Sequence, residues 1–456
     1  MGVGSYSWFV LLILASIYAQ QQWSRYSLNY LYNVSADDDK TSIAEADHIS
    51  YANYGILTGY GFSATFCIAG LFAGRAADIM SRRLIVFSGV AIWNAALFMI
   101  GYSTNFALVL CWRLVLGLGQ AFSNPASYSL IADYFPEEKR AMANGLFACG
   151  VYIGGGLASL CISMANGLGW RATCFLIAVV GFILAAVEGL FVKEPARGSN
   201  KKAAQEPDKP KRSFEDALRT IFSNRLVVLV FAASSLRFMG GYAIAGYLPT
   251  FYGIVFPSYD DQYSFINAYV VASGGFLSSW LGGMIADEWR RTEVKARMYL
   301  PACGCFFSLP FIAVCCLAPN FYVSILIGLF LEYLVAECWF GPVVATMQSA
   351  LPPDCRALAI ACFTLLATFF GSLASYLIGV VYDLLLANGY SPKIIQWIVL
   401  WSVVISYSSS GALFVYGAAL VPSDQPTLAS PANEAKPLLK KQEPISASDA
   451  AAENEV

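Results

Sequence analysis

The stretch Gly74-Arg75-Ala76-Ala77-Asp78, followed by Arg82-Arg83, occurs twice in this sequence. It returns as Gly283-Met284-Ile285-Ala286-Asp287, followed by Arg290-Arg291, about 209 residues further on. Pro136 with Arg140 returns as Pro352 with Arg356, and Arg25 has a counterpart in Arg237, both at nearly the same offset. A constant offset over several matches indicates a duplicated unit, with both copies in the same orientation.

The composition predicts an integral membrane protein. Hydrophobic residues make up 57% of the 456 residues and charged residues only 13%, whereas soluble proteins carry about a quarter charged residues. A membrane-spanning helix needs about 20 apolar residues. The apolar runs predict helices near 8–32, 50–73, 84–103, 107–131, 141–164, 171–192, 226–252, 263–285, 298–317, 321–348, 357–386 and 394–420.

The repeat and these runs together predict an all-α membrane protein with twelve transmembrane helices in two pseudo-symmetric six-helix bundles. We expect residues 1–192 and 226–420 to form the bundles and residues 193–225 to form a cytosolic linker. Residues 421–456 are polar and poor in aromatics, which predicts a disordered tail. Parallel repeats of this kind are related by an axis along the membrane normal, with a substrate site between them near the midplane.

The distribution of Lys and Arg predicts that both termini are cytosolic. Of the 28 Lys and Arg residues, only Lys40, Arg171 and Lys393 fall in the loops of the other side. Positive residues gather on the cytosolic side of membrane proteins. The sequon at Asn33 then lies in the first outer loop, where glycosylation is possible.

The residue types give little support for a metal site, a cofactor site or an enzyme active site. His48 is the only histidine, and the 12 cysteines form no CxxC pair and lie mostly in apolar runs. Buried cysteines of this kind are usually packing residues. We therefore expect no metal site, no cofactor and no enzyme activity, and the net charge of −2 gives no reason to expect a nucleic-acid partner.

Two further motifs give a family resemblance. Gly74-x3-Asp78-x3-Arg82-Arg83 and Arg113-x3-Gly117-x-Gly119 resemble the signatures of the major facilitator superfamily, although Ile79 and Ser81 depart from the usual pattern. Within that superfamily, residues 25–27, 128–136 and 341–342 resemble the spinster family, with Ser24 in place of its usual acidic residue. The resemblance implies a secondary transporter that works by alternating access. It also implies a lysolipid or sphingosine phosphate as cargo and, for several members, a lysosomal location.

Polar residues inside the predicted spans are the candidate substrate-binding residues. A charged side chain inside a membrane is costly and usually faces an interior cavity, and polar residues at three- and four-residue steps share one helix face. The duplication would place Arg25 and Arg237 on opposite walls, where both could hold one anionic group. Alternatively, Arg113 braces span four against span one, and the other two arginines pair with acidic residues. The candidates are Arg25, Arg237, Arg113, Tyr18, Gln21, Asn29, Gln120 and Asn124.

Two acidic residues of span ten are the candidates for ion coupling. Glu332 and Glu337 are five residues apart, about 140° on a helical wheel. We expect one to face the cavity, where it could carry a coupling proton, and the other to face a neighbouring helix.

Charged residues at the cytosolic ends of the spans are the candidate gating residues. We expect Asp78 to approach the start of span eleven, where the helix dipole favours a carboxylate, and Arg82 to pair with Asp133 and close the two halves on that side. Alternatively, the positive residues only fix the orientation of the chain. The gating set is Gly74, Asp78, Arg82, Arg83, Asp133, Arg140, Asp287 and Arg356.

The favoured function is secondary active transport of an anionic amphiphile such as a lysophospholipid or a sphingoid phosphate. Alternatives are a small organic anion or sugar carrier of the same fold, and a non-transporting subunit of a larger assembly. We expect a monomer among membrane lipids, with protons as possible coupling ions. Glu434, Leu438 and Leu439 form an acidic dileucine pattern, which indicates a lysosomal or endosomal membrane as an alternative to the plasma membrane.

Overall fold

The computed structural model describes residues 4–32, 42–46, 49–195, 213–352 and 355–421. These residues form helices and no strands. The N-terminal helices are α1 (Ser5–Leu31), α2 (Ile43–Ala46), α3 (Tyr51–Thr58), α4 (Tyr60–Ile79), α5 (Arg82–Tyr102), α6 (Phe106–Ala121), α7 (Ser123–Tyr134), α8 (Glu137–Ala148), α9 (Gly150–Ser159), α10 (Cys161–Leu168) and α11 (Trp170–Phe191).

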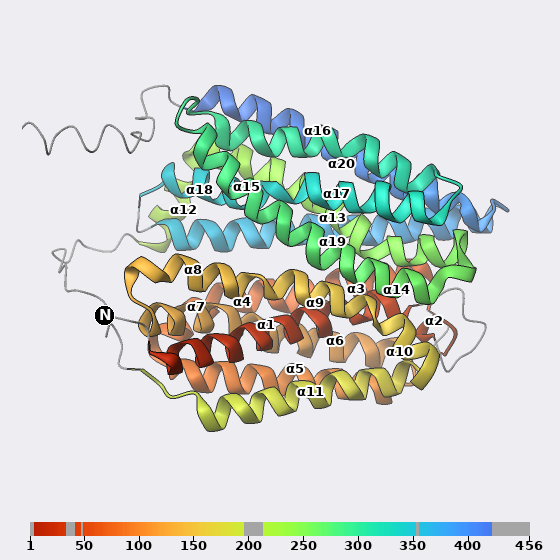
Figure 1. The fold of residues 1–456 in the computed structure, drawn as a ribbon, viewed down its shortest axis with the longest axis horizontal. Coiled ribbons are helices and arrows are strands. Elements are labelled where there is room, and N and C mark those ends of the chain that lie inside the picture. The colour runs from red at the N-terminus through yellow and green to blue at the C-terminus, as the bar shows by residue number, and fades with distance from the viewer. Residues whose placement is uncertain (1–3, 33–41, 47–48, 196–212, 353–354, 422–456) are drawn as a thin grey trace, which may run out of the picture.

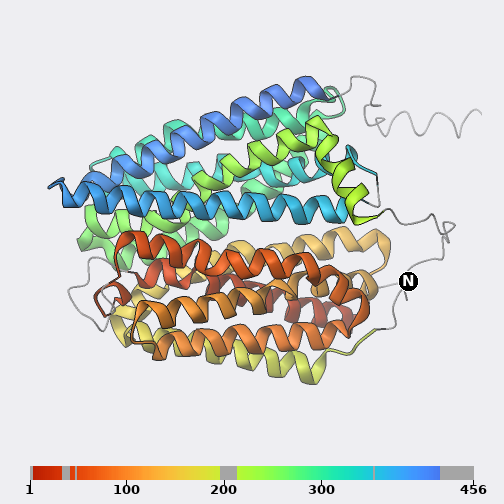
Figure 2. The ribbon, with the colours of Figure 1, turned by 180° about the vertical axis from the view of Figure 1, so that it is seen from behind.

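The second half repeats this arrangement after a short helix. Its helices are α12 (Phe214–Ser223), α13 (Arg225–Val255), α14 (Asp260–Tyr269), α15 (Gly275–Trp289), α16 (Ala296–Leu317), α17 (Phe330–Ala336), α18 (Phe340–Ser349), α19 (Arg356–Ala387) and α20 (Ile395–Leu420). The helices up to α11 pack into one bundle and those from α13 onward into another (Figure 1). Figure 2 shows the same two layers from behind.

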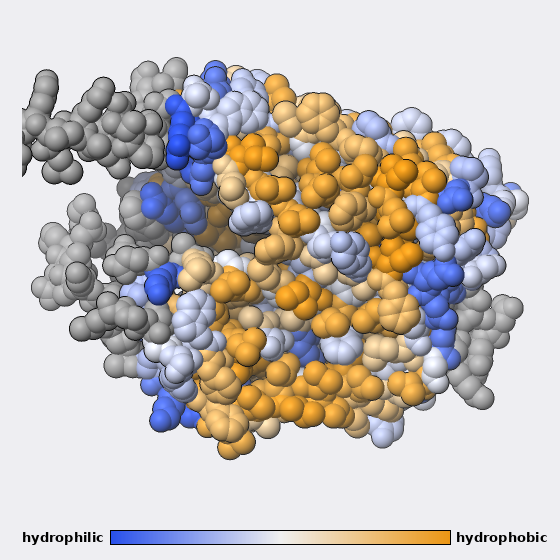
Figure 3. All heavy atoms as spheres, viewed as in Figure 1, coloured by the Kyte–Doolittle hydropathy of each residue, from blue (hydrophilic) through white to orange (hydrophobic). Residues whose placement is uncertain are grey.

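Eleven helical segments of the described residues are long and apolar enough to cross a membrane. The remaining predicted span corresponds to α1, which has 27 residues and therefore a length of about 40 Å. Gln20, Gln21, Gln22 and Arg25 reduce its apolar character. Figure 3 shows hydrophobic side chains over the middle of the visible face and hydrophilic ones at its two ends. The all-α fold predicted from the sequence is confirmed.

The two ends of the molecule differ in charge. We call the end at which α15 ends and α16 begins, on the left of Figure 1, the basic end, because it carries Arg290 and Arg297 and the start of α5 with Arg82; the other is the opposite end. The first turn of α1 and the last turn of α20 lie at the basic end (Figure 1). This arrangement follows from an even number of crossings in each half.

The bundles approach each other closely at the opposite end. α3 packs against α19, and α9 and α10 pack against α14. A methyl group at Gly156 would lie 2.6 Å from the carbonyl oxygen of Ala268, and one at Gly379 would overlap the carbonyl oxygen of Tyr51. Toward the basic end, a methyl group at Gly145 or Gly283 would meet nothing within 4 Å. Glycine therefore permits close helix approach between the bundles at the opposite end.

Candidate functional site

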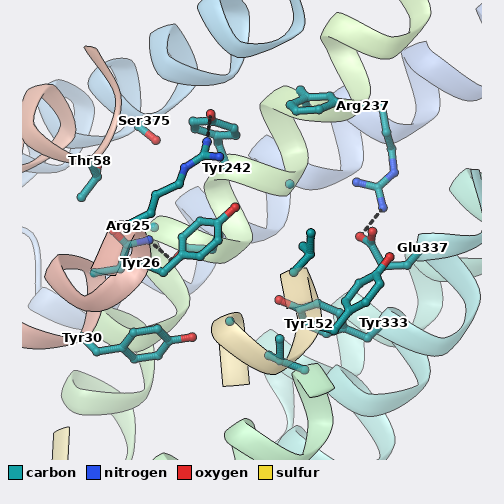
Figure 4. A pocket seen from close by; sticks show the side chains of 18 of the residues that line it. Arg25, Tyr26, Tyr30, Thr58, Tyr152, Arg237, Tyr242, Tyr333, Glu337 and Ser375 are labelled. Carbon is teal, nitrogen blue, oxygen red and sulfur yellow. Dashed lines mark hydrogen bonds and ion pairs between the residues drawn. The ribbon is translucent and has the colours of Figure 1, made fainter. Parts of the chain in front are cut away.

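A cavity of about 210 Å³ lies between the two bundles (Figure 4). Its walls come from α1, α3 and α9 of the first bundle and from α13, residues 270–274, α17, the turn after α17 and α19 of the second. Polar and aromatic side chains from both halves share it. They include Arg25, Tyr26, Asn29, Tyr30, Tyr152, Arg237, Phe238, Tyr242, Tyr333, Glu337 and Trp339.

Arg25 supplies an uncompensated positive charge to this cavity. Its Nη2 donates to the hydroxyl oxygen of Tyr242 at 2.8 Å, and its guanidinium carbon lies 4.3 Å from the ring centre of Phe62. No carboxylate forms an ion pair with Arg25 among the residues that the structure describes. Because its partners are neutral, the guanidinium remains available to an anionic ligand.

Arg237 is in a different electrostatic state. Its Nη2 donates to Glu337 Oε1 at 3.1 Å and to the carbonyl oxygen of Ala336 at 3.0 Å. The Arg237 side chain is 2% exposed and that of Glu337 is 25% exposed, so the carboxylate presents the more accessible charge. Arg25 and Arg237 both line the cavity, as predicted, but only Arg237 has a carboxylate partner there. The alternative, pairing with an acidic residue, holds for Arg237.

A break in span ten positions Glu337. α17 ends at Ala336, and residues Glu337–Trp339 form a single 3₁₀ turn before α18 begins. Glu332, one turn earlier, is 1% exposed, accepts a hydrogen bond from the hydroxyl of Tyr407 at 3.3 Å and does not line the cavity. The two carboxylates thus face different surroundings, as their spacing predicts.

Several candidate binding residues instead hold the first bundle together. Arg113 donates to the carbonyl oxygens of Arg25 at 3.0 Å and Leu57 at 3.3 Å. The side chain of Gln21 donates to the carbonyl oxygen of Gln120, and Gln120 donates to that of Gln21. None of these side chains lines the cavity. Arg113 therefore braces span four against spans one and two, as the alternative for this residue proposed.

The other polar residues predicted for the site are divided between the cavity and the bundle interior. Asn29 lines the cavity and donates across it to the carbonyl oxygen of Ala245 at 2.9 Å. Tyr18 stacks on Phe147 at 4.6 Å between ring centres, and Asn124 has a buried side-chain oxygen without a hydrogen bond. Neither Tyr18 nor Asn124 lines the cavity.

The Arg82–Asp133 pair forms, with 2.5 Å between Nη1 and Oδ2. Both residues belong to the first bundle, on α5 and α7, so this contact does not join the halves, and that part of the expectation is wrong. Arg82 also donates to Glu194 at 2.8 Å. Partial burial opposes ionisation of Glu194, but hydrogen bonds from the Arg83 backbone, Arg82 and Ser81 outweigh it and lower its pKa.

The other gating candidates bond within their own half. Arg83 donates to the carbonyl oxygen of Gly189, and Arg140 donates to that of Ala132. Asp287 pairs with Arg297 at 2.7 Å, and Arg356 donates to the carbonyl oxygen of Leu351. The side chain of Asp78 and the surroundings of Gly74 lie outside the described part, as do Asn33, Glu434, Leu438 and Leu439. Their roles stay predictions.

Asp383 is a candidate functional residue that the sequence analysis missed. This carboxylate of α19 accepts hydrogen bonds from the backbone N–H groups of Tyr51, at 3.2 Å, and Ala52, at 2.8 Å, in the first turn of α3. A carboxylate at a helix N-terminus is favoured by the helix dipole. Asp383 therefore holds the two bundles together at the opposite end. An acidic residue late in an otherwise apolar span was the available signal.

The aromatic lining was mostly missed as well. Tyr26 and Tyr30 lie on the face of α1 that carries Asn29, while Tyr152 and Tyr333 come from apolar runs of the two halves. Tyrosines are common throughout the chain, which has 26 of them. No sequence pattern distinguishes those that meet at the cavity.

Comparison with known proteins identifies the family. The Major Facilitator Superfamily profile matches residues 3–376. The chain belongs to the major facilitator superfamily. It is 23% identical over 341 residues to an MFS-type efflux pump of Mycolicibacterium smegmatis, covering 72% of this chain and 75% of that protein. It is 25% identical over 389 residues to protein spinster homolog 1 of Homo sapiens, covering 79% and 72%.

A solved structure of this superfamily has the same fold. A bacterial homolog of the human lysosomal transporter spinster, in an inward-facing and unoccupied conformation, aligns with a TM-score of 0.75 and 20% identity. The alignment covers 92% of this chain and 96% of that chain. The resemblance to the spinster proteins is thus confirmed. The protein is a multi-pass membrane transporter of the major facilitator superfamily rather than an enzyme.

Proposed function

We propose that this transporter binds the anionic group of an amphiphile, such as a lysophospholipid or a sphingoid phosphate, at Arg25. The observation that carries the proposal is the unpaired guanidinium of Arg25 in the wall of the central cavity. A phosphate bound there would gain a charge-assisted hydrogen bond without displacing a carboxylate. Tyr242 holds the guanidinium in place from the other bundle.

The opposite wall of the cavity favours a ligand with an additional cationic or hydroxyl group. Glu337 is the more exposed partner of its pair with Arg237, and Tyr152 and Tyr333 line the cavity near it (Figure 4). Trp339 lines the same cavity, two residues after Glu337. Aromatic rings beside a carboxylate suit an amine or quaternary ammonium group. A zwitterionic head group would therefore place its phosphate at Arg25 and its amine toward Glu337.

Glu337 is also our candidate for ion coupling. Protonation of its carboxylate would weaken the contact with Arg237 and leave that guanidinium with a positive charge in the cavity wall. The net charge of Arg25, Arg237 and Glu337 would then be two positive charges instead of one, which favours an anionic ligand electrostatically. Proton binding would therefore support the binding of an anionic ligand that has no amine, whereas the amine of a zwitterionic ligand would compete with the proton for Glu337.

Alternating access requires the contacts at the opposite end to break. Those contacts include the hydrogen bonds of Asp383 to α3, the pair of Ser63 and Ser372 at 2.7 Å and the bond from Ser163 to Asp261 at 2.9 Å. The neutral Ser63–Ser372 hydrogen bond contributes about 1 kcal/mol, and each hydrogen bond to the carboxylates of Asp383 and Asp261 contributes about 1.5–3 kcal/mol. A set of this strength can open and close during transport.

Substrate transport by purified protein in liposomes tests the proposal. We expect Arg25→Ala to lower the transport of a radiolabelled zwitterionic lysophospholipid at least tenfold, because a hydrogen bond to a charged group contributes about 1.5–3 kcal/mol. Arg219→Ala is the matched control, since Arg219 is 75% exposed on α12, away from the cavity. Equal transport by the two variants contradicts the proposed role of Arg25.

A small organic anion is the second candidate substrate, and the size of the cavity favours it. The volume of about 210 Å³ is below the usual range of about 300–1,000 Å³ for small-molecule sites. A compact anion would fit entirely inside, whereas an amphiphile would fit only by its head group. A competition experiment distinguishes the two candidate substrates, with small carboxylates or sugar acids added to the transport assay of labelled lysophospholipid. If the compact anions are the only compounds that inhibit transport, the second candidate is indicated.

A further inference from the structure

A second cavity, of about 240 Å³, lies at the basic end of the second bundle. It is bounded by the starts of α13 and α16 and by the ends of α15, α18 and α20. Arg290 and Arg297 line it. It shares no lining residue with the central cavity.

The two arginines give this cavity an excess of positive charge. Arg297 pairs with Asp287, a residue that is 63% exposed and does not line the cavity. Arg290 forms no ion pair or side-chain hydrogen bond with any residue in the described ranges. Burial and the nearby charge of Arg297 both lower the pKa of Arg290, and Asp287 offsets this only in part. Two guanidinium groups therefore face one carboxylate.

The buried polar group of this cavity that lacks a hydrogen-bond partner is also a donor. The Nε atom of Arg297 is buried and has no hydrogen-bond partner. The neutral polar residues of the lining already donate to backbone carbonyls: Asn224 to Ala350, Thr346 to Pro342 and Ser349 to Thr346. A ligand that completes the site must accept hydrogen bonds and carry negative charge.

Among the described residues no acidic one lines this cavity, and its wall also contains apolar residues such as Leu226, Val294 and Met298. α16 begins at Ala296, so the positive end of its dipole points toward the same space. Guanidinium groups match the geometry of phosphate oxygens and bind them through paired N–H groups. These features exclude a cation and favour a tetrahedral oxyanion.

We propose that the cavity lined by Arg290 and Arg297 is a binding site for a phosphate group. The group can belong to the head of an anionic phospholipid, because the site lies where transmembrane helices end, or to a small soluble phosphate compound. The site is separate from the proposed transport site and does not rest on it. Its ligand would connect α15 with α16, which flank the second copy of the repeated charged loop.

Thermal unfolding of the full-length protein tests this site. Inorganic phosphate is titrated against chloride at constant ionic strength in neutral nanodiscs, and nanodiscs containing phosphatidic acid are compared with phosphatidylcholine alone. We expect at least one of these anions to raise the unfolding temperature, because a ligand that binds only the folded state stabilises it. A response to phosphate alone indicates a soluble ligand, and a response to phosphatidic acid alone indicates a lipid.

Arg290→Gln and Arg291→Gln form a matched pair of variants. Arg291 is 41% exposed, pairs with Glu288 and does not line the cavity. We expect Arg290→Gln to weaken the apparent affinity for the anion about tenfold or more, with Arg291→Gln close to wild type. Arg290→Lys, which keeps the charge but loses the paired N–H geometry, should fall between them. An equal response in all four proteins, or none in wild type, overturns the proposal.

Discussion

The two halves of the chain carry arginines in corresponding regions, at the cavity and at the basic end, but differ in which of these arginines has a carboxylate partner. In the first half, Arg25 at the cavity has no carboxylate partner among the described residues, whereas Arg82 at the basic end is paired with Asp133 and Glu194. In the second half, Arg237 at the cavity is paired with Glu337. At the basic end, Arg291 lies at the repeat offset from Arg82 and pairs with Glu288, whereas its neighbour Arg290 has no carboxylate partner in the described part. The repeat accounts for the recurrence of the cations, and the acidic residues beside each of them decide which cation is left to bind an anion.

This difference has a thermodynamic consequence. A buried guanidinium with a carboxylate partner cannot be removed without leaving the partner's charge uncompensated. An arginine with neutral partners can be removed with less effect on the fold. The paired arginines should therefore matter mainly for stability and the unpaired ones mainly for ligand binding.

The largest expected effect is at the cavity. Arg237→Ala should lower the free energy of unfolding by about 3 kcal/mol, because it leaves the Glu337 carboxylate in the membrane without its cation. The double variant Arg237→Ala with Glu337→Gln should recover part of this loss. Arg25→Ala should cost less than about 1 kcal/mol. Unfolding in mixed detergent micelles measures all three, and equal losses for the two single variants contradict the contrast between the cavity arginines.

The second effect is at the basic end. Arg82→Ala should cost about 2 kcal/mol, because the Asp133 side chain is only 8% exposed and loses its guanidinium contact. Arg290→Ala, which removes an unpaired arginine at the same end of the other half, should stay within about 0.5 kcal/mol of wild type in the absence of added anions. The same unfolding titration compares them. If Arg290→Ala lowers the free energy of unfolding more than Arg82→Ala does, the assignment of ion pairs at the basic end is wrong.

A smaller effect tests where the halves touch. Gly379→Ala places a methyl group against the backbone of Tyr51 and should destabilise the contact between the bundles by about 1–3 kcal/mol. Hydrogen exchange of residues 51–58 should then become faster. Gly283→Ala, toward the basic end of the same bundle, meets open space and should leave exchange there unchanged. If residues 51–58 remain protected from hydrogen exchange in both variants, the bundles are not in tight contact at the opposite end.

The smallest effect is a pH dependence confined to the first half. The pKa of Glu194 is lowered in the folded protein, so its stabilising contribution is present above the unfolded value of about 4.3 and is lost as the pH falls through the folded value. Since Glu194 is 31% exposed, the contribution should be below about 1 kcal/mol. Glu194→Gln should flatten the acid limb of the stability profile, while Glu215→Gln, at an exposed pair, should not.

The sequence was a good guide to elements and a partial guide to the site. Apolar runs about 20 residues long and the repeated charged loop are local signals, and they predicted the helices and the family. The sequence predicted the cavity positions of Arg25, Asn29, Arg237 and Glu337, because charged and polar residues inside a span are expected to face a cavity. Tyr18, Gln21, Arg113, Gln120 and Asn124 were expected in the same cavity but lie within the first bundle. The periodicity of a helix shows that residues share a face, and that face can meet a neighbouring helix as well as a cavity.

The amino-acid sequence by itself determined the transmembrane helices, the duplication and the places of the buried arginines, because hydrocarbon thickness and the cost of charge act on each segment separately. Only the tertiary structure decided which arginine meets a carboxylate, that Asp383 reaches the backbone of α3 and that Arg290 and Arg297 line one cavity. Such contacts join residues that lie many turns or several helices apart. Their energies depend on distances of a few ångströms, which are set by packing between helices.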